Sequence, residues 1–177
     1  MRKSLLRLGG MPETIADAPD REVVILCERD AVHATFSRYA PGRDGADVHI
    51  HRTHSDVFYV LEGELTLKRP EGDVTVPAGS FVRVPPMVAH GFANRGETTL
   101  KYLNFHVPGT GFADYMRGLR DGVKVPFDQE PAPDGHVSPG EPSVGDAVEL
   151  DGVRITVAET EPDGALLYAH GVAVTPR

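Results

Sequence analysis

Residues 48–63 read VHIHRTHSDVFYVLEG, and this stretch decides the fold prediction. His49 and His51 stand two residues apart, so in an extended strand both imidazoles project to one face while Ile50 points to the other. The run that begins at Asp56 is rich in β-branched and aromatic residues and ends in a glycine, which is typical of a second strand. We therefore expect two strands joined by a short polar loop, with the imidazoles and the carboxylate near their junction.

Outside this stretch the chain keeps the same character. Its 19 Gly and 15 Pro place turn signals at short intervals, and β-branched runs rather than helical periods lie between them. This cadence predicts an all-β sandwich or barrel. We expect strands at residues 22–27, 33–39, 48–51, 56–68, 73–76, 80–84, 90–94 and 98–107.

One segment has a helical period instead. Thr110 can cap a short helix over about residues 111–121, and Gly122 can end it. The apolar face of this helix is expected to pack on the barrel and comprises Phe112, Tyr115, Met116 and Leu119.

A change of composition near residue 125 suggests how the chain is divided. Residues 1–125 are expected to form the barrel, with its N-terminal strands and the helix. Residues 126–177 are expected to begin with a Pro-rich linker or wrapping loop and to continue as a β-rich extension. Three short strands are expected there, at 147–150, 153–158 and 165–174, which could cover a sheet edge or join a neighbouring subunit.

Charge and cysteine content narrow the class of protein. The 18 Lys+Arg and 26 Asp+Glu give a formal net charge of -8, which disfavours nucleic acid or an anionic membrane as the main partner. The single cysteine, Cys27, cannot form an intrachain disulfide, and neither an export signal nor a membrane span is recognisable. The prediction is a cytoplasmic protein with a small-molecule substrate.

A metal site is the one sharp chemical signal. His90 follows two prolines and can bring a third imidazole to His49 and His51, while Asp56 can add a carboxylate. Three imidazoles and a carboxylate suit one divalent transition metal, such as Fe, Mn, Ni, Cu or Zn, with positions left open for a ligand. The spacings of the other histidines demand no metal; these are His33, His106, His136 and His170.

Two motifs in this region resemble those of the cupin superfamily. The first, a glycine, His-x-His, an acid and a second glycine, corresponds to Gly45, His49, His51, Asp56 and Gly63. The second corresponds to Pro86, His90 and Asn94. The resemblance implies a double-stranded β-helix, or jelly roll, that binds a metal at its mouth. The family usually has glutamate where Asp56 stands, so the fourth ligand is either Asp56 or, because the aspartate arm is shorter, His54.

Within the superfamily, the chain resembles quercetinase-like dioxygenases, which implies an oxidoreductase acting on a small oxygenated or aromatic compound. In that case Asp56 would also accept the substrate's proton. Two alternatives stay open: an isomerase, cyclase or decarboxylase that uses the metal as a Lewis acid, and a non-catalytic small-molecule-binding module. The resemblance also implies a homodimer. The residues expected to line the substrate pocket are Phe58, Phe81, Met87, Phe92 and Tyr102.

Overall fold

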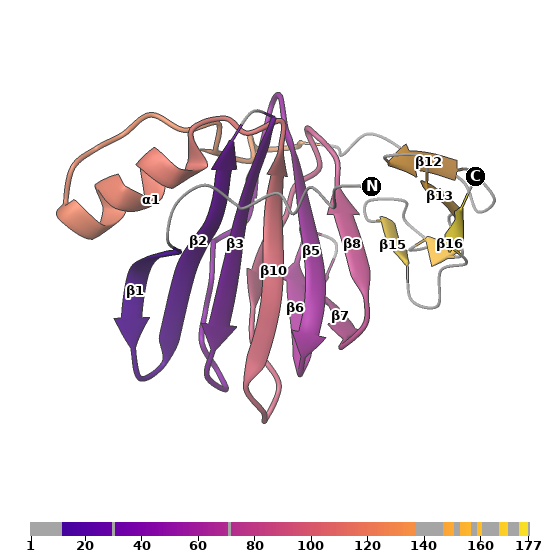
Figure 1. Cartoon of the computed structure of the whole chain (residues 1–177), viewed down its shortest axis with the longest axis horizontal. Helices are drawn as coiled ribbons and strands as arrows, with labels where there is room; N and C mark the ends of the chain where they lie inside the picture. Colours follow the sequence, from indigo (N-terminus) through magenta and orange to yellow (C-terminus); the bar gives the residue numbers. More distant parts are fainter. Residues whose placement is uncertain are drawn as a thin grey trace, which may run out of the picture.

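The computed structural model describes residues 12–29, 31–70 and 72–136, together with the backbone of five short strands between residues 147 and 176. Figure 1 shows a large sheet facing the viewer with smaller sheets behind it. The strands of the barrel region are β1 (Glu13–Ala18), β2 (Arg21–Arg29), β3 (Val32–Tyr39), β4 (His49–Ile50), β5 (Ser55–Glu62), β6 (Glu64–Lys68), β7 (Val74–Pro77), β8 (Phe81–Val84), β9 (Gly91–Ala93) and β10 (Leu100–Val107).

The remaining elements follow the barrel in the sequence. They are α1 (Phe112–Asp121), β11 (Glu130–Pro131), β12 (Ala147–Leu150), β13 (Val153–Thr156), β14 (Glu159–Thr160), β15 (Leu167–Ala169) and β16 (Val174–Pro176). The all-β prediction with one short helix is confirmed. Strands β1 and β11 were not expected from the sequence. The sequence of β1 mixes polar with apolar residues, and β11 has only two residues, so neither shows a clear strand pattern.

The large sheet has the order β1-β2-β3-β10-β5-β8-β15-β14, and a second sheet has the order β7-β6-β9. All the pairings are antiparallel. The order interleaves distant parts of the sequence, since β10 lies between β3 and β5. Strand β15 of the C-terminal extension pairs with β8 and so continues the large sheet.

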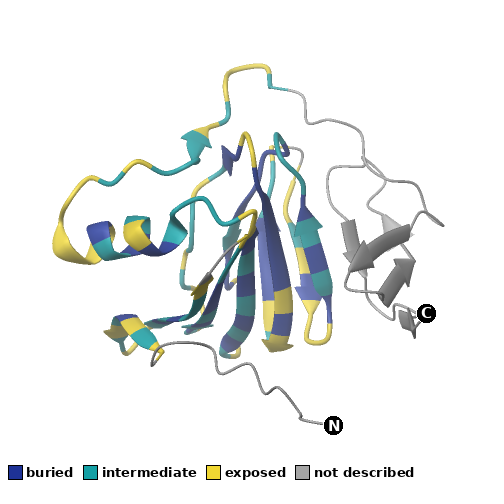
Figure 2. Cartoon of the chain, turned by 45° about the horizontal axis from the view of Figure 1, so that its top comes forward, coloured by how far each residue is buried: buried dark blue, intermediate teal, exposed yellow. Residues whose placement is uncertain are grey.

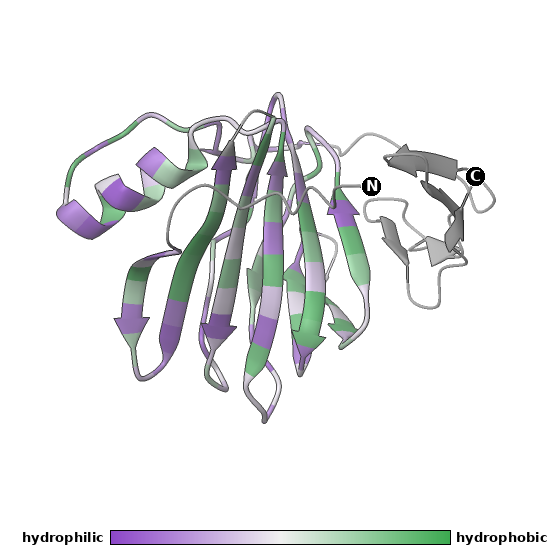
Figure 3. Cartoon of the chain, viewed as in Figure 1, coloured by the Kyte–Doolittle hydropathy of each residue, from purple (hydrophilic) through white to green (hydrophobic). Residues whose placement is uncertain are grey.

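The hydrophobic core lies between the two sheets. Apolar residues concentrate along β2, β5 and β8 (Figure 3), and β5 is buried over most of its length but exposed near its end (Figure 2). Phe58 and Val60 of β5 and Leu65 and Leu67 of β6 have no exposed surface. Burying four such side chains stabilises the fold by roughly 6–12 kcal/mol in transfer free energy, before the entropy of ordering the chain is subtracted.

The expected strand over 56–68 is divided at Gly63, where the chain turns from β5 into β6. Gly63 has a φ of 74°, and a Cβ built on it would lie 2.5 Å from the carbonyl oxygen of Thr99. Only glycine fits this turn without displacing the neighbouring backbone. The division returns the chain to the second sheet and so closes the barrel.

Helix α1 begins at Phe112, but the expected cap at Thr110 is wrong. Gly111 occupies the N-cap position with φ 82°, and no side chain caps the helix. The Thr110 hydroxyl lies instead 3.2 Å from Nδ1 of His54. The C-terminal end agrees with the prediction, since Gly122 is left-handed with φ 69°. The helix lies beside the β1–β2 edge of the large sheet (Figure 1).

Candidate metal centre

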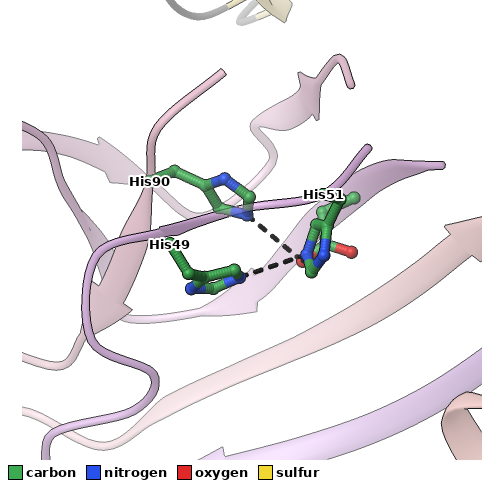
Figure 4. A group of neighbouring side chains, drawn as sticks. His49, His51 and His90 are labelled. Atoms are coloured by element: carbon green, nitrogen blue, oxygen red, sulfur yellow. Dashed lines mark hydrogen bonds and ion pairs between the residues drawn. The ribbon is translucent and has the colours of Figure 1, made fainter. Parts of the chain in front are cut away.

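Backbone pairing brings the three predicted imidazoles together. His49 and His90 form an isolated antiparallel bridge, in which each backbone N–H donates to the other residue's carbonyl oxygen at 2.9 Å. His51 follows two residues after His49 and turns its ring to the same side. Figure 4 shows the three rings directed towards one another. All three are almost fully buried, with exposures of 4 % or less.

Each of these rings is fixed by a hydrogen bond from Nδ1 to a backbone carbonyl. The acceptor is Asp47 for His49 at 2.6 Å, Val88 for His90 at 3.0 Å, and Asp128 for His51. A carbonyl oxygen can only accept, so Nδ1 carries the hydrogen and Nε2 presents a lone pair. Three Nε2 lone pairs therefore converge on one buried place.

The close approach of these lone pairs is compatible with a cation between them. Nε2 of His49 lies 3.1 Å from Nε2 of His51, and neither nitrogen has a hydrogen to share in this tautomer. Two nitrogens bound to one ion at about 2.1 Å would lie about 3.0–3.4 Å apart for angles between octahedral and tetrahedral. The observed separation fits a shared metal ion.

Asp56 supplies an oxygen at the same place. Its Oδ2 lies 3.4 Å from Nε2 of His90 and 3.5 Å from Nε2 of His51. The four side chains His49, His51, Asp56 and His90 place their ligand atoms within 4.8 Å of one another. The structure thus brings Asp56, rather than His54, into the group that contains all three predicted imidazoles.

The protonation states of His49 and Asp56 also suit a metal. Burial lowers the pKa of His49 to about 3, which keeps its imidazole neutral at pH 7. Burial alone would raise the pKa of Asp56, but His106, His51 and His90 outweigh it and hold that pKa well below the usual range. For His51, burial lowers the pKa, whereas contacts with Asp56 and Asp128 raise it overall. An ionised Asp56 is a good ligand and a weak proton acceptor.

His106 also belongs to the site, although its sequence position did not suggest it. It lies on β10 directly opposite Asp56 of β5 in the strand register, and its Nε2 is 2.9 Å from Asp56 Oδ1. The two oxygens of Asp56 are thereby shared between two sets of imidazoles. The sequence does not tell which strand pairs with β10 or in which register. Without that knowledge, His106 could not be placed beside Asp56.

His54 lies on the same side of Asp56 as His106. Its Nε2 is 3.7 Å from Asp56 Oδ1 and has no hydrogen-bond partner among the described residues. Its Nδ1 lies 2.9 Å from Oδ2 of Asp128. Burial lowers its pKa to about 4, so this imidazole is also neutral at pH 7. A second four-residue group within ligand distance consists of His51, His54, Asp56 and His106.

The segment after α1, expected to be a linker or wrapping loop, wraps over this cluster. The Asp128 carboxylate accepts hydrogen bonds from the backbone N–H of Arg52 at 2.9 Å and of Thr53 at 2.8 Å, besides the one from His54. The ring of Phe127 packs against several of the imidazoles, with its centroid 5.3 Å from that of His54. Residues 127–131 are hereafter called the strap.

A comparison of the sequence with protein-family models finds a match to the cupin domain over residues 35–106. This range includes the three imidazoles, Asp56, and also His106. Residues 35–106 are therefore a cupin domain, in agreement with the two motifs noted in the sequence. The two facing sheets are therefore the double-stranded β-helix expected from the sequence.

Among curated proteins, this cupin is similar to quercetin 2,3-dioxygenase of Bacillus subtilis, with 29% identity over 113 residues. The match takes in 64% of the chain but only 30% of the length of the dioxygenase. Among solved structures, an RmlC-like cupin from Shewanella frigidimarina is 28% identical with a TM-score of 0.47, covering 56% of this chain and 86% of the other. A double-stranded β-helix protein from Klebsiella pneumoniae is 20% identical with a TM-score of 0.48, covering 53% and 82%.

A cavity of about 220 Å³ opens beside the candidate metal ligands. His49, His51 and Asp56 line one part of it, and Phe92 and Tyr102, two of the expected pocket residues, line another. The other three expected residues do not line it. Phe58 is fully buried in the core, and Phe81 pairs with Tyr59 on the sheet.

Met87 is the third expected pocket residue that does not line the cavity, and its backbone conformation is unusual. It has a φ of 68°, and among the described residues it is the one non-glycine with positive φ. Its N–H donates to the carbonyl of His51 at 2.7 Å, and its own carbonyl accepts from Nε2 of His136 at 2.7 Å. Val88, the next residue, does not need the left-handed conformation, because Met87 makes the turn.

Proposed function

We propose that this cupin is a metal-dependent oxidoreductase of the dioxygenase type that acts on a small oxygenated compound. The observation that carries the proposal is the convergence of three Nε2 lone pairs and one ionised carboxylate beside a cavity. The similarity to quercetin 2,3-dioxygenase supports the choice of reaction. The cavity is smaller than the roughly 300–1,000 Å³ typical of sites for drug-sized ligands, which favours a substrate smaller than a flavonol.

In this proposal His49, His51, Asp56 and His90 hold one divalent transition metal per chain. When bound, a redox-active metal would supply open positions for a substrate oxygen and for O2. The chain's own contribution is to keep the imidazole of His49 neutral, to hold Asp56 ionised and to orient it through His106. The expected second role of Asp56, accepting a proton from the substrate, stays a prediction, and its low pKa favours the ligand role.

Metal analysis with oxygen measurement tests the proposal. We expect protein purified without added metal to contain close to one transition-metal ion per chain, and to consume O2 with an aromatic hydroxy compound. His49→Ala and Asp56→Ala should lose the metal and the oxygen uptake. His33→Ala is the control, since His33 lies on β3 outside both groups.

Stoichiometric metal that is unaffected by both substitutions would contradict the site assignment. Conversion of a substrate without O2 uptake would instead favour the Lewis-acid reaction, an isomerisation, cyclisation or decarboxylation at the same residues. Tight ligand binding without any conversion would favour the non-catalytic binding module.

We also propose a homodimer in the cytoplasm. Strand β1 ends the described order of the large sheet at one edge, and an edge strand can pair with a second copy. Light scattering at micromolar concentration should then give twice the chain mass.

Within the described part of the chain, the structure has no helix of the length and hydrophobicity that a membrane crossing needs.

A further inference from the structure

The cavity continues from the metal ligands to a guanidinium group that the proposed function does not use. Tyr102 and Asn104 precede His106 along β10 at alternate positions, all three are buried, and all three line the cavity. Each two-residue step along an antiparallel strand covers about 7 Å. Arg21, the first residue of β2, lines the same cavity.

Arg21 lies among aromatic side chains. Its Cζ is 5.8 Å from the ring centroid of Tyr39, its neighbour in the strand register. The Tyr39 ring in turn lies 5.6 Å from that of Tyr102. A guanidinium group that lies over an aromatic face keeps the five N–H donors in its own plane free to bind another partner.

The charge of Arg21 has no carboxylate partner among the described residues, and its buried Nε has no hydrogen-bond acceptor there. The second arginine of the cavity, Arg43, is different because it lies 3.3 Å from Asp20. Arg38 on the neighbouring strand pairs with Glu22 at 3.3 Å. A partly buried guanidinium without an anion leaves donors unpaired, which an anionic ligand would satisfy.

We propose that Arg21 binds the carboxylate of a small substrate whose opposite end carries an oxygen donor for the metal-ligand cluster. Between the two ends the walls include Phe92, Phe112 and Met116, so the middle of the molecule is apolar or aromatic. The substrate class is therefore a small aromatic hydroxycarboxylic acid. This inference rests on the proposed function, since it assigns the substrate of the same site.

Calorimetric binding of 2-, 3- and 4-hydroxybenzoate and of their methyl esters tests the inference with metal-loaded and metal-free protein. We expect at least one acid to bind the wild-type protein at least tenfold more tightly than its ester. Arg21→Gln should remove that preference by weakening the acid alone, and Arg21→Lys should restore part of it, because lysine keeps the charge but not the forked donors. Arg38→Gln, outside the cavity, is the matched control and should bind as wild type.

Unchanged metal content and circular dichroism would show that Arg21→Gln is folded. Equal affinities for acid and ester, no binding of any acid, or an Arg21→Gln variant that still prefers the acid would each overturn the inference. An acid preference that depends on Arg21, without O2 uptake, would keep the anion site and reject the oxidoreductase proposal. Oxygen uptake with the acids that Arg21→Gln leaves unchanged would reject the anion site alone.

Discussion

Asp56 is the residue that connects the histidines of the candidate site. One of its oxygens faces His51 and His90, and the other faces His106 at 2.9 Å. A carboxylate fully withdrawn from water stays ionised only when such partners compensate for its lost hydration. The same partners also fix its orientation, so the shorter arm of aspartate still reaches the imidazole cluster.

His106→Gln should therefore weaken metal binding without removing a predicted ligand. Loss of a partner that orients a metal ligand usually costs about 10–100-fold in affinity, and we expect a decrease in that range. Competition with a chelator measures it, with His33→Gln, the register partner of His106 on β3, as the control. Equal affinity in both variants would show that His106 does not orient Asp56.

The strap is the element that ties the region after α1 to the metal-ligand loop. The Asp128 carboxylate accepts from Arg52, Thr53 and His54, while its backbone carbonyl accepts from His51. Burial raises the pKa of Asp128, but these donors outweigh it and hold the pKa well below the ordinary value. The strap thus fixes two of the imidazoles from the outside.

Asp128→Ala should loosen this element. Charge-assisted hydrogen bonds to a partly buried carboxylate contribute about 1–3 kcal/mol, so we expect a decrease of that size in the free energy of unfolding. Amide hydrogen exchange at residues 127–130 should become faster, and metal affinity should fall because the loosened strap carries the backbone carbonyl that orients His51. Glu130→Gln is the control on the same strap, because it removes only an exposed ion pair with Arg52 and should change little. Exchange rates that stay at the wild-type value would argue against the strap's role.

Turn glycines offer a second test at the scale of elements. Gly63 and Gly79 both have positive φ, 74° and 87°, but a Cβ on Gly63 would meet the Thr99 carbonyl at 2.5 Å whereas one on Gly79 would meet nothing within 4 Å. Gly79→Ala should cost about 1 kcal/mol of stability for the backbone conformation alone. Gly63→Ala should cost clearly more in urea unfolding, and equal costs would mean that the backbone near Thr99 yields easily.

For the whole molecule, the buried imidazoles predict how stability depends on pH in the metal-free protein. The pKa of His49 is lowered from 6.5 to about 3 and that of His54 to about 4. Between those values and 6.5 the unfolded chain binds protons that the folded chain does not, so the stability contributed by His49 and His54 is fully present above pH 6.5 and is lost on acidification. The pKa of His51 is raised instead, so the stability that it contributes is fully present below pH 6.5 and is lost as the pH rises above that value. It does not change the loss of stability expected on acidification.

Urea unfolding of metal-free protein at pH 4.5, 5.5 and 7.0 measures this dependence. The free energy of unfolding should fall by up to about 1.4 kcal/mol per pH unit for each proton taken up. His54→Gln should show a shallower fall, because it removes one of the two groups. A flat profile between pH 7.0 and 4.5 would contradict the neutral, buried state of these imidazoles.

The all-β architecture and the three imidazoles were predictable because they depend on local pattern. The period of two along a strand places His49 and His51 on one face, and two prolines precede His90. The helix over 112–121 and the glycine that ends it follow from local pattern as well. The N-terminal end of that helix was misassigned, since the Thr110 hydroxyl is used by His54.

Only the tertiary structure decided the rest of the site. His106 meets Asp56 through the register of β10 with β5, Asp128 reaches the imidazoles by the path of the strap, and Arg21 lines the same cavity from strand β2. Phe58 and Phe92 are both aromatic strand residues, yet one is in the core and the other lines the cavity. Such contacts join residues distant in sequence, and strand order and register, which no local period specifies, determine them.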